Sequence, residues 1–186
     1  PKPWADALDE RPAAWCFPIP SLTDIGFAAN VESSPRMAPG ASAANQLLND
    51  FLTRIDRYEQ TRDFPAIKGP SYLSVHLRFG TVSIRRLAAT ALQRSRHGSH
   101  GASVWLGELI WRDFYHQILA ARPDAAHADY RSRGDRWNED DDELQAWKEG
   151  RTGYPIVDAG MRQLRREGFM HNRARMVVAS FLVKDL

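Results

Sequence analysis

The stretch SVWLGELIWRDFYHQIL, residues 103–119, places chemically capable side chains along one predicted helix. Stacked Trp rings and one carboxylate suit a planar, nitrogen-bearing ligand, because Trp packs its faces and Glu accepts from ring N–H groups. The alternative is a structural Glu–Arg pair at i,i+4 with Trp packing around it. On a helical wheel one third of the circle carries Trp105, Glu108, Trp111, Arg112, Tyr115 and Leu119.

The same helix has an apolar stripe at four-residue spacing. It consists of Leu106, Ile110, Phe114 and Ile118. Such a stripe is typical of a face that packs against the rest of a domain. We therefore expect this stripe to be the core face of the helix.

A second motif, MHNRARM, begins another predicted helix. Arg173 and Arg175 fall in its first turn, where the helix dipole favours acidic residues. A carboxylate elsewhere in the protein or a bound phosphate is expected to offset them. Asn172 and Met176 share one face at i,i+4, with Arg175 between them, and Arg173 projects to another side.

The elements that position these residues are predicted to be helices. Residues 1–40 carry seven of the eleven prolines and are predicted to be a linker, with extended chain over 17–27. A short helix ending near Gly80 is favoured over a strand. The other predicted helices are 43–58, one capped by Ser83, 103–119, one closed by Gly150, one with Pro155 in its first turn and Gly168 past its end, and 172–186.

Composition narrows the class of protein. The 186 residues suffice for one domain with a core, and no apolar run approaches the roughly 20 residues needed to span a membrane. Cys16 is the single cysteine, so we expect no internal disulfide and a cytoplasmic location. The His residues show no ligand spacing, and we expect no metal ion.

Charge is less informative. The net charge of +2 is too small to indicate a nucleic-acid binder, although 21 of the 25 basic residues are Arg. A GC-rich genome explains that count as readily as phosphate recognition does. The chain starts at Pro1 and ends in an apolar helical pattern without a stop signal, so we expect a piece of a larger protein.

Four segments resemble the flavin-binding helical domain of the cryptochrome/photolyase family. They are YEQTRDFPAIKG, WLGELIWRDFY, RWNEDDDELQAWKEGRTGYPIVDAGMRQL and GFMHNRARMVVASFLVKDL, and they are most similar to class I cyclobutane pyrimidine dimer photolyases. The resemblance implies an all-α fold, an incomplete helical FAD-binding domain. Residues 1–40 would be the interdomain linker and 41–186 the N-terminal two-thirds of that domain, while the antenna domain with its chromophore would be absent.

The resemblance also implies a function. Reduced FAD, excited by blue light, donates an electron to a flipped-out pyrimidine dimer in DNA, the ring splits, and the electron returns. Glu108 would stabilise the dimer radical anion, and Trp137 would be the outermost Trp of the chain that photoreduces the flavin. The residues matched to substrate and DNA contacts are Arg62, Glu108, Trp111, Asn172, Arg173 and Met176.

The residues matched to the FAD pocket are Tyr58, Ser71, Tyr72, Leu73, Ser74, Trp105, Arg112 and Arg175. In the loop GPSYLS, Pro70 and Tyr72 depart from the family pattern, because Pro70 lacks the hydroxyl and N–H of the usual Thr. Two other readings stay open: a cryptochrome that signals without repair, and a helical interaction module without flavin. Glu108, Trp111, Asn172 and Met176 together favour dimer repair. We expect the isolated chain to be inactive, and its apolar truncation surface is a candidate for self-association.

Overall fold

The computed structural model describes residues 20, 21, 23–27, 38–134, 136–138 and 140–186. The chain divides into two units, residues 1–33 and 34–186. Most of the predicted linker lies outside the described residues. Its described part differs from the extended chain that we expect, because residues 23–26 form a turn closed by a hydrogen bond from Gly26 N to Thr23 O (3.1 Å). The domain boundary at residue 40 stays a prediction.

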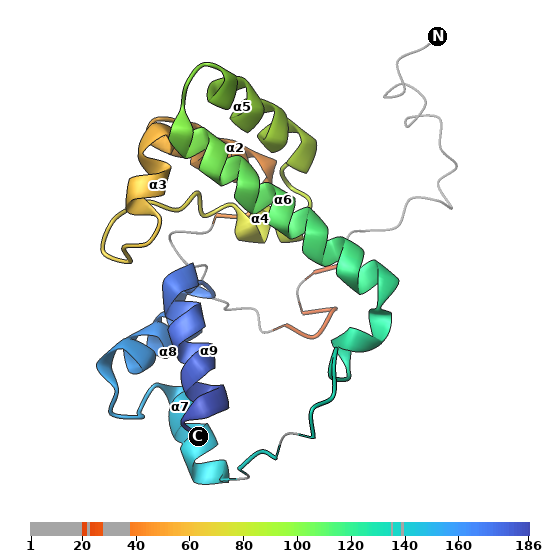
Figure 1. Ribbon diagram of the computed structural model, residues 1–186, viewed down its shortest axis with the longest axis vertical. Helices are drawn as coiled ribbons and strands as arrows, with labels where there is room; N and C mark the ends of the chain where they lie inside the picture. Colours follow the sequence, from red (N-terminus) through yellow and green to blue (C-terminus); the bar gives the residue numbers. More distant parts are fainter. Residues whose placement is uncertain (1–19, 22, 28–37, 135, 139) are drawn as a thin grey trace. The chain divides into compact units, whose positions relative to one another are not determined.

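The unit 34–186 is built from two groups of helices, each with its own core (Figure 1). The described residues contain helices and turns but no β-strand, which confirms the all-α class. Even the longest described helix lacks the apolar stretch needed to cross a membrane. The first group comprises α2 (Gly40–Leu52), η2 (Ile55–Arg57), α3 (Tyr58–Thr61), α4 (Ser74–Arg78), α5 (Ile84–Arg96) and α6 (His100–Ala121).

The single helix predicted over 43–58 is broken after Leu52. The Thr53 hydroxyl donates to Asp50 O (2.7 Å) at the end of α2, and the chain continues through η2 into α3. The apolar pattern runs on without interruption, because Ile55 is fully buried together with Leu48 and Phe51. The predicted cap at Ser83 is confirmed, because its hydroxyl accepts from Arg86 N (3.4 Å). The short helix predicted before Gly80 is also confirmed: α4 forms there, and the alternative of a strand is excluded.

Helix α6 buries a different face from the predicted stripe. Its buried residues are Gly101, Ala102, Trp105 and Leu109. Leu106, the first residue of the stripe, does pack against the core. Ile110 and Phe114 are 61% and 46% exposed, so the prediction that they belong to the core face is wrong. The start of α6 packs so closely on the 55–56 backbone that Gly101 has no room for a Cβ, and Trp105 and Leu109 continue this packed face into the core. Ile110 and Phe114 lie outside that core.

Two glycines of α6 provide a matched test of this packing. A Cβ at Gly101 would lie 2.2 Å from Ile55 O, whereas a Cβ at Gly107 would meet nothing within 4 Å. We expect Gly101→Ala to destabilise the chain by about 3 kcal/mol through overpacking. Gly107→Ala should stabilise it by about 1 kcal/mol, the helix-propensity difference. Urea denaturation measures both, and equal effects of the two substitutions would contradict the close approach.

Whereas η3 (Pro123–Ala126) follows α6 and contacts it, the second group contains α7 (Asp141–Glu149), α8 (Pro155–Glu167) and α9 (Asn172–Lys184). Its termini agree with the sequence signals, since Pro155 occupies the first turn of α8 and Gly150 and Gly168 are left-handed C-caps. Trp147 Nε1 donates to Val178 O (3.1 Å) and ties α7 to α9. The buried apolar residues of this group are Val157, Met161, Met170, Ala174 and Val178.

Candidate functional site

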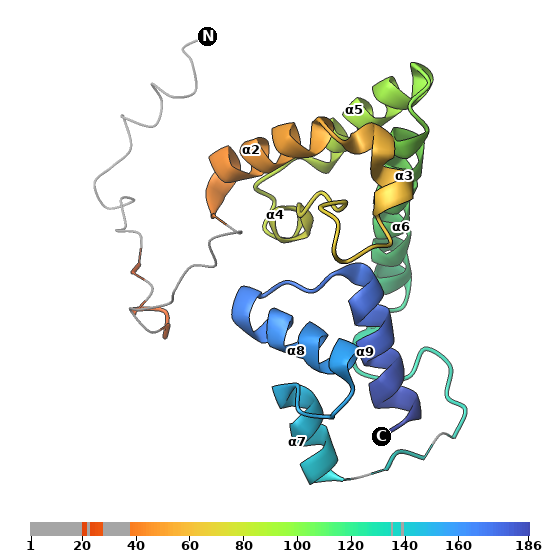
Figure 2. The ribbon, with the colours of Figure 1, turned by 90° about the vertical axis from the view of Figure 1, so that its left-hand side faces the viewer.

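An open cavity of about 350 Å³ is lined by segments from both groups of helices. Its walls come from α3, the loop before α4, α6 and the start of α9. Figure 2 shows the ribbon of these helices from the side. Ligand pockets typically measure roughly 300–1,000 Å³. The cavity is lined by Tyr58, Arg62, Asp63, Pro70, Ser71, Tyr72, Leu73, Ser74, Glu108, Phe169, Met170, His171, Asn172 and Arg175. Nine of the fifteen residues singled out in the sequence therefore share one cavity.

Charged side chains form a network along this cavity. Arg62 Nη1 lies 2.7 Å from Glu108 Oε1, and Arg62 Nε lies 3.5 Å from Asp63 Oδ1. Glu108 therefore pairs with Arg62, which directly follows α3, and not with Arg112, which contradicts the i,i+4 alternative. Arg112 instead donates to Leu77 O (3.4 Å). The carboxylate of Glu108 is held at the cavity wall by a partner 46 positions away in the sequence.

The arginines at the start of α9 find different partners. Arg173 donates from Nε to Asp63 Oδ1 (2.8 Å), and its Nη2 lies 2.7 Å from the same oxygen. A carboxylate from the other group of helices thus offsets Arg173, one of the two possibilities that the sequence left open. Arg175 Nε donates to Met170 O (3.1 Å), which orients its guanidinium beside the cavity.

Tyr58 forms the inner end of the cavity. Its ring packs against Phe51 at 5.7 Å, and the Arg62 guanidinium lies 5.5 Å from its centroid. Burial, followed by the nearby charge of Glu108, raises the pKa of Tyr58 to about 12. The phenol therefore stays protonated at neutral pH and keeps its O–H as a hydrogen-bond donor.

The loop before α4 supplies hydroxyl groups. Ser71 and Ser74 line the cavity, and Leu73 between them is fully buried and anchors the loop in the core. Tyr72 adopts a left-handed backbone (φ 58°), which is uncommon for a residue other than glycine. Its ring packs against Phe169 at 5.1 Å, so the residue that departs from the family pattern contacts the segment before α9.

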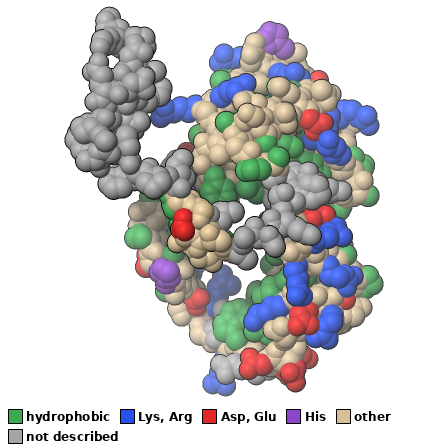
Figure 3. Space-filling view, turned by 180° about the vertical axis from the view of Figure 1, so that it is seen from behind, with side chains coloured by type: hydrophobic (Ala, Val, Ile, Leu, Met, Phe, Trp, Pro, Cys, Tyr) green, Lys and Arg blue, Asp and Glu red, His purple; other side chains and the backbone are tan. Residues whose placement is uncertain are grey.

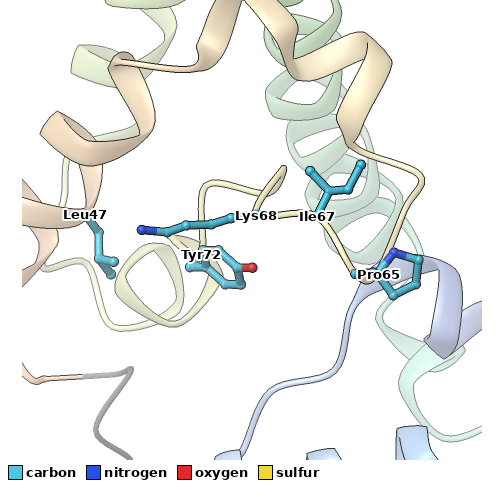
Figure 4. Close-up of a pocket in the computed structure, with 6 residues that line it drawn as sticks. Leu47, Pro65, Ile67, Lys68 and Tyr72 are labelled. Atoms are coloured by element: carbon cyan, nitrogen blue, oxygen red, sulfur yellow. The ribbon is translucent and has the colours of Figure 1, made fainter.

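Tyr72 also borders a neighbouring cavity of about 450 Å³ (Figure 4). The other walls of this cavity are Leu47 of α2 and Pro65, Ala66, Ile67 and Lys68 of the loop. The Lys68 ammonium is already paired with Asp50 (2.9 Å). Apart from Tyr72, this second cavity contains no residue that the sequence singled out.

His171 lines the first cavity and was not singled out in the sequence. Its Nδ1 accepts from Arg173 N (3.2 Å) and caps α9, which places the ring proton on Nε2. Nε2 is buried and interacts with the backbone of Arg62, although no hydrogen bond of good geometry forms there. The only sequence signal for His171 is its position directly before Asn172 and Arg173.

His171 should make stability depend on pH. Burial, assisted by the positive charge of Arg173, lowers its pKa below the usual 6.5. As the pH falls, the His171 ring is protonated in the unfolded chain at a higher pH than in the folded chain. Its contribution to the free energy of unfolding is therefore fully present above pH 6.5 and is lost as the pH falls through the folded pKa. We therefore expect the free energy of unfolding to decrease as the pH is lowered below 6.5. His171→Asn keeps a capping oxygen and should flatten this dependence, whereas the exposed control His116→Asn should not; equal pH profiles in denaturation would contradict this role.

Six of the singled-out residues lie outside the cavity lining. Trp105 is only 3% exposed and packs on Phe51 at 4.8 Å, so it belongs to the core in this structure and not to the cavity wall. Trp111 is 55% exposed and forms an aromatic group with Phe114 (5.5 Å) and Tyr115 (6.0 Å). The other four are Arg112, Trp137, Arg173 and Met176.

The chemistry of the cavity fits a dinucleotide with phosphates and planar rings. Arg62 and Arg175 are cations, Ser71 and Ser74 carry hydroxyls, and Tyr58 offers an aromatic face. Arg is suited to phosphate through its fork of donors, and hydroxyls complete such contacts. On the face shown in Figure 3, Lys and Arg side chains are interspersed with Asp and Glu side chains.

Residues 105–186 match a family described as the FAD binding domain of DNA photolyase. The chain is 50% identical to the deoxyribodipyrimidine photo-lyase of Streptomyces griseus over 155 residues, 82% of this chain and 33% of the relative. It is also 50% identical to that of Escherichia coli K12, over 91% of this chain and 37% of the relative. The chain thus spans about a third of the length of these curated relatives.

Solved structures agree with the sequence relatives. A class III photolyase from Agrobacterium tumefaciens is 41% identical with a TM-score of 0.76, covering 80% of this chain and 32% of that one. A Synechocystis cryptochrome is 29% identical with a TM-score of 0.78, covering 89% and 36%. These likenesses define a flavin-binding helical domain of photolyase type. The chain belongs to the cryptochrome/photolyase family. Its assignment to class I within that family stays a prediction.

Proposed function

We propose that the whole protein repairs cyclobutane pyrimidine dimers in DNA by a light-dependent reaction with FAD as cofactor, and is therefore a carbon–carbon lyase. The observation that carries this proposal is the convergence, in one cavity, of nine residues matched to flavin, dimer or DNA-phosphate contacts. The curated relatives at 50% identity are named deoxyribodipyrimidine photo-lyase, which supports the same reaction.

In this proposal the residues divide by chemistry. When bound, reduced FAD supplies the light-excited electron. Glu108 accepts hydrogen bonds from the damaged pyrimidine edge, and Trp111 stacks on the extruded bases. Arg62 and Arg173 contact DNA phosphate, while Asn172 and Met176 contact the dimer. The flavin contacts are assigned to Tyr58, Ser71, Tyr72, Leu73, Ser74, Trp105, Arg112 and Arg175. Because the Trp105 ring is buried, this contact requires the flavin to lie directly beside that ring.

A blue-light receptor without repair activity is the second candidate. The fold is as similar to a receptor as to a repair enzyme, since the TM-scores are 0.78 with the Synechocystis cryptochrome and 0.76 with the Agrobacterium photolyase. Glu108 and Asn172 at the cavity wall favour repair, because they give a nucleobase edge an acceptor and a donor. The exposed Trp111 adds a stacking surface.

The test is repair of a defined substrate. The whole protein is incubated with reduced flavin and an oligonucleotide containing one thymine dimer, under blue light and in the dark. Restored thymine absorbance in the light sample only supports the proposal. Dimer binding without restoration would favour the receptor. We propose further that the isolated 186-residue chain is inactive, and the same assay on that chain tests this.

A further inference from the structure

Asp63 is the residue at which the charged network converges. Its Oδ1 receives both Nε and Nη2 of Arg173, at 2.8 and 2.7 Å, and also lies 3.5 Å from Arg62 Nε. Arg62 in turn holds Glu108 at 2.7 Å. Asp63 thus connects three side chains to which DNA or dimer contacts are assigned, although no such contact is assigned to Asp63 itself.

This connection joins the two groups of helices. Asp63 follows α3, whereas Arg173 is in the first turn of α9, 110 positions later. Two nitrogens of one guanidinium on a single carboxylate oxygen restrict the orientation of the arginine. The Asp63 and Arg173 side chains are 48% and 38% exposed, so the pair remains accessible at the cavity edge.

The network is balanced in charge. Arg62 and Arg173 contribute two positive charges, and Asp63 and Glu108 contribute two negative charges. A DNA phosphate that approaches either arginine competes with a carboxylate already in place. Binding of any DNA therefore has an electrostatic cost here, while a ligand that also fills the cavity gains contacts that undamaged DNA lacks.

We propose that Asp63 is a positioning residue that determines the preference for damaged over undamaged DNA. It holds Arg173 directly, and Arg62 through their shared contact, in the orientation that receives the backbone of a strand whose dimer occupies the cavity. This inference rests on the proposed function. It differs from simple repulsion, because repulsion would weaken both kinds of DNA equally and leave the preference unchanged.

Asp63→Asn keeps the size of the side chain and removes its charge. Undamaged DNA should bind more tightly to the variant, because the sequence-independent term follows local positive charge. Dimer-containing DNA should bind less tightly, because the arginines lose their fixed orientation. Solvent screens charged hydrogen bonds at a half-exposed site and weakens them. We therefore expect the ratio of the affinities for damaged and undamaged DNA to fall about fivefold.

The experiment compares affinities of the whole protein for two otherwise identical duplexes, with and without one dimer, in the dark. Asp142→Asn is the matched control: it makes the same charge change at an exposed position of α7 outside the cavity. Thermal unfolding of each variant shows whether the fold is intact. Asp63→Asn combined with Arg173→Gln completes a double-mutant cycle, in which the effects on the preference should be non-additive.

The expected result is a reduced preference for Asp63→Asn, an unchanged preference for Asp142→Asn, and coupling to Arg173. Equal tightening of both duplexes would reduce Asp63 to a repulsive charge and overturn the inference. Unchanged affinities, or equal weakening with a lower Tm, would also overturn it. A wild-type protein without any dimer preference would instead remove the proposed function, and this inference with it.

Discussion

Replacing Glu108 by Ala in the whole protein should reduce the quantum yield of dimer repair severalfold while changing dimer affinity by less than about tenfold. The carboxylate lies at the cavity wall, 37% exposed and held by Arg62 at 2.7 Å. A hydrogen bond to a charged group contributes about 1.5–3 kcal/mol, and solvent screening lowers this contribution at a part-exposed carboxylate. The substitution also frees the positive charge of Arg62 for DNA phosphate, which compensates part of the lost affinity.

The control for this prediction is Glu59→Ala, the same change at an exposed position of α3 that pairs with His100 (3.2 Å) and lies outside the cavity. It should leave both quantities unchanged. Glu108→Gln, which keeps a hydrogen-bond acceptor without the charge, should fall between Ala and the wild type. Repair yield is measured at saturating DNA from photons absorbed and dimers reverted. A collapsed affinity with a normal yield would show that Glu108 only binds the substrate.

Trp111→Ala should weaken binding of dimer-containing DNA by about 1–3 kcal/mol, the range for stacking of a base on an aromatic ring. This corresponds to roughly five- to 150-fold in Kd. The side chain is 55% exposed. Phe114 packs against it edge-on and Tyr115 stacks beside it at 6.0 Å, so a base would stack on the face that Tyr115 leaves free. Because it contributes little to the core, Tm should change little.

Ile110→Ala is the matched control, since Ile110 precedes Trp111 on α6 and is equally exposed at 61%. Affinities for dimer-containing and undamaged duplexes are measured by fluorescence anisotropy in the dark. The Trp111 variant should lose affinity for the damaged duplex more than for the undamaged one. An affinity equal to that of the wild type would exclude stacking by Trp111.

Local signals in the sequence predicted helix ends well, because each depends on a few adjacent residues. Ser83, Gly150, Pro155 and Gly168 stand at the ends where they were expected. The break after Leu52 carries no Pro or Gly, and the buried Ile55 extends the apolar pattern across it. The segment after the break packs closely against Gly101 of α6, a tertiary contact that the local sequence does not contain.

The core face of α6 shows the same limit of periodicity. Apolar residues at four-residue spacing indicate an apolar helix face, but they do not identify which element of the fold packs against that face. In this structure Ala102, Trp105 and Leu109 are buried, and Ile110 and Phe114 are exposed. The sequence predicted that an anion must offset the arginines of α9. Identifying Asp63 as the partner of Arg173 requires a contact over 110 positions, which no local spacing contains.

The most direct test of the central claim, that these helices form the wall of a flavin pocket, is an absorbance spectrum. The whole protein is incubated with FAD, passed through a desalting column and scanned for flavin bands; the 186-residue chain is treated in parallel. We predict stoichiometric flavin in the whole protein, and retention by the chain alone would show that these helices suffice to hold it. A whole protein that emerges without flavin, although folded by circular dichroism, would contradict the account and support a flavin-free interaction module.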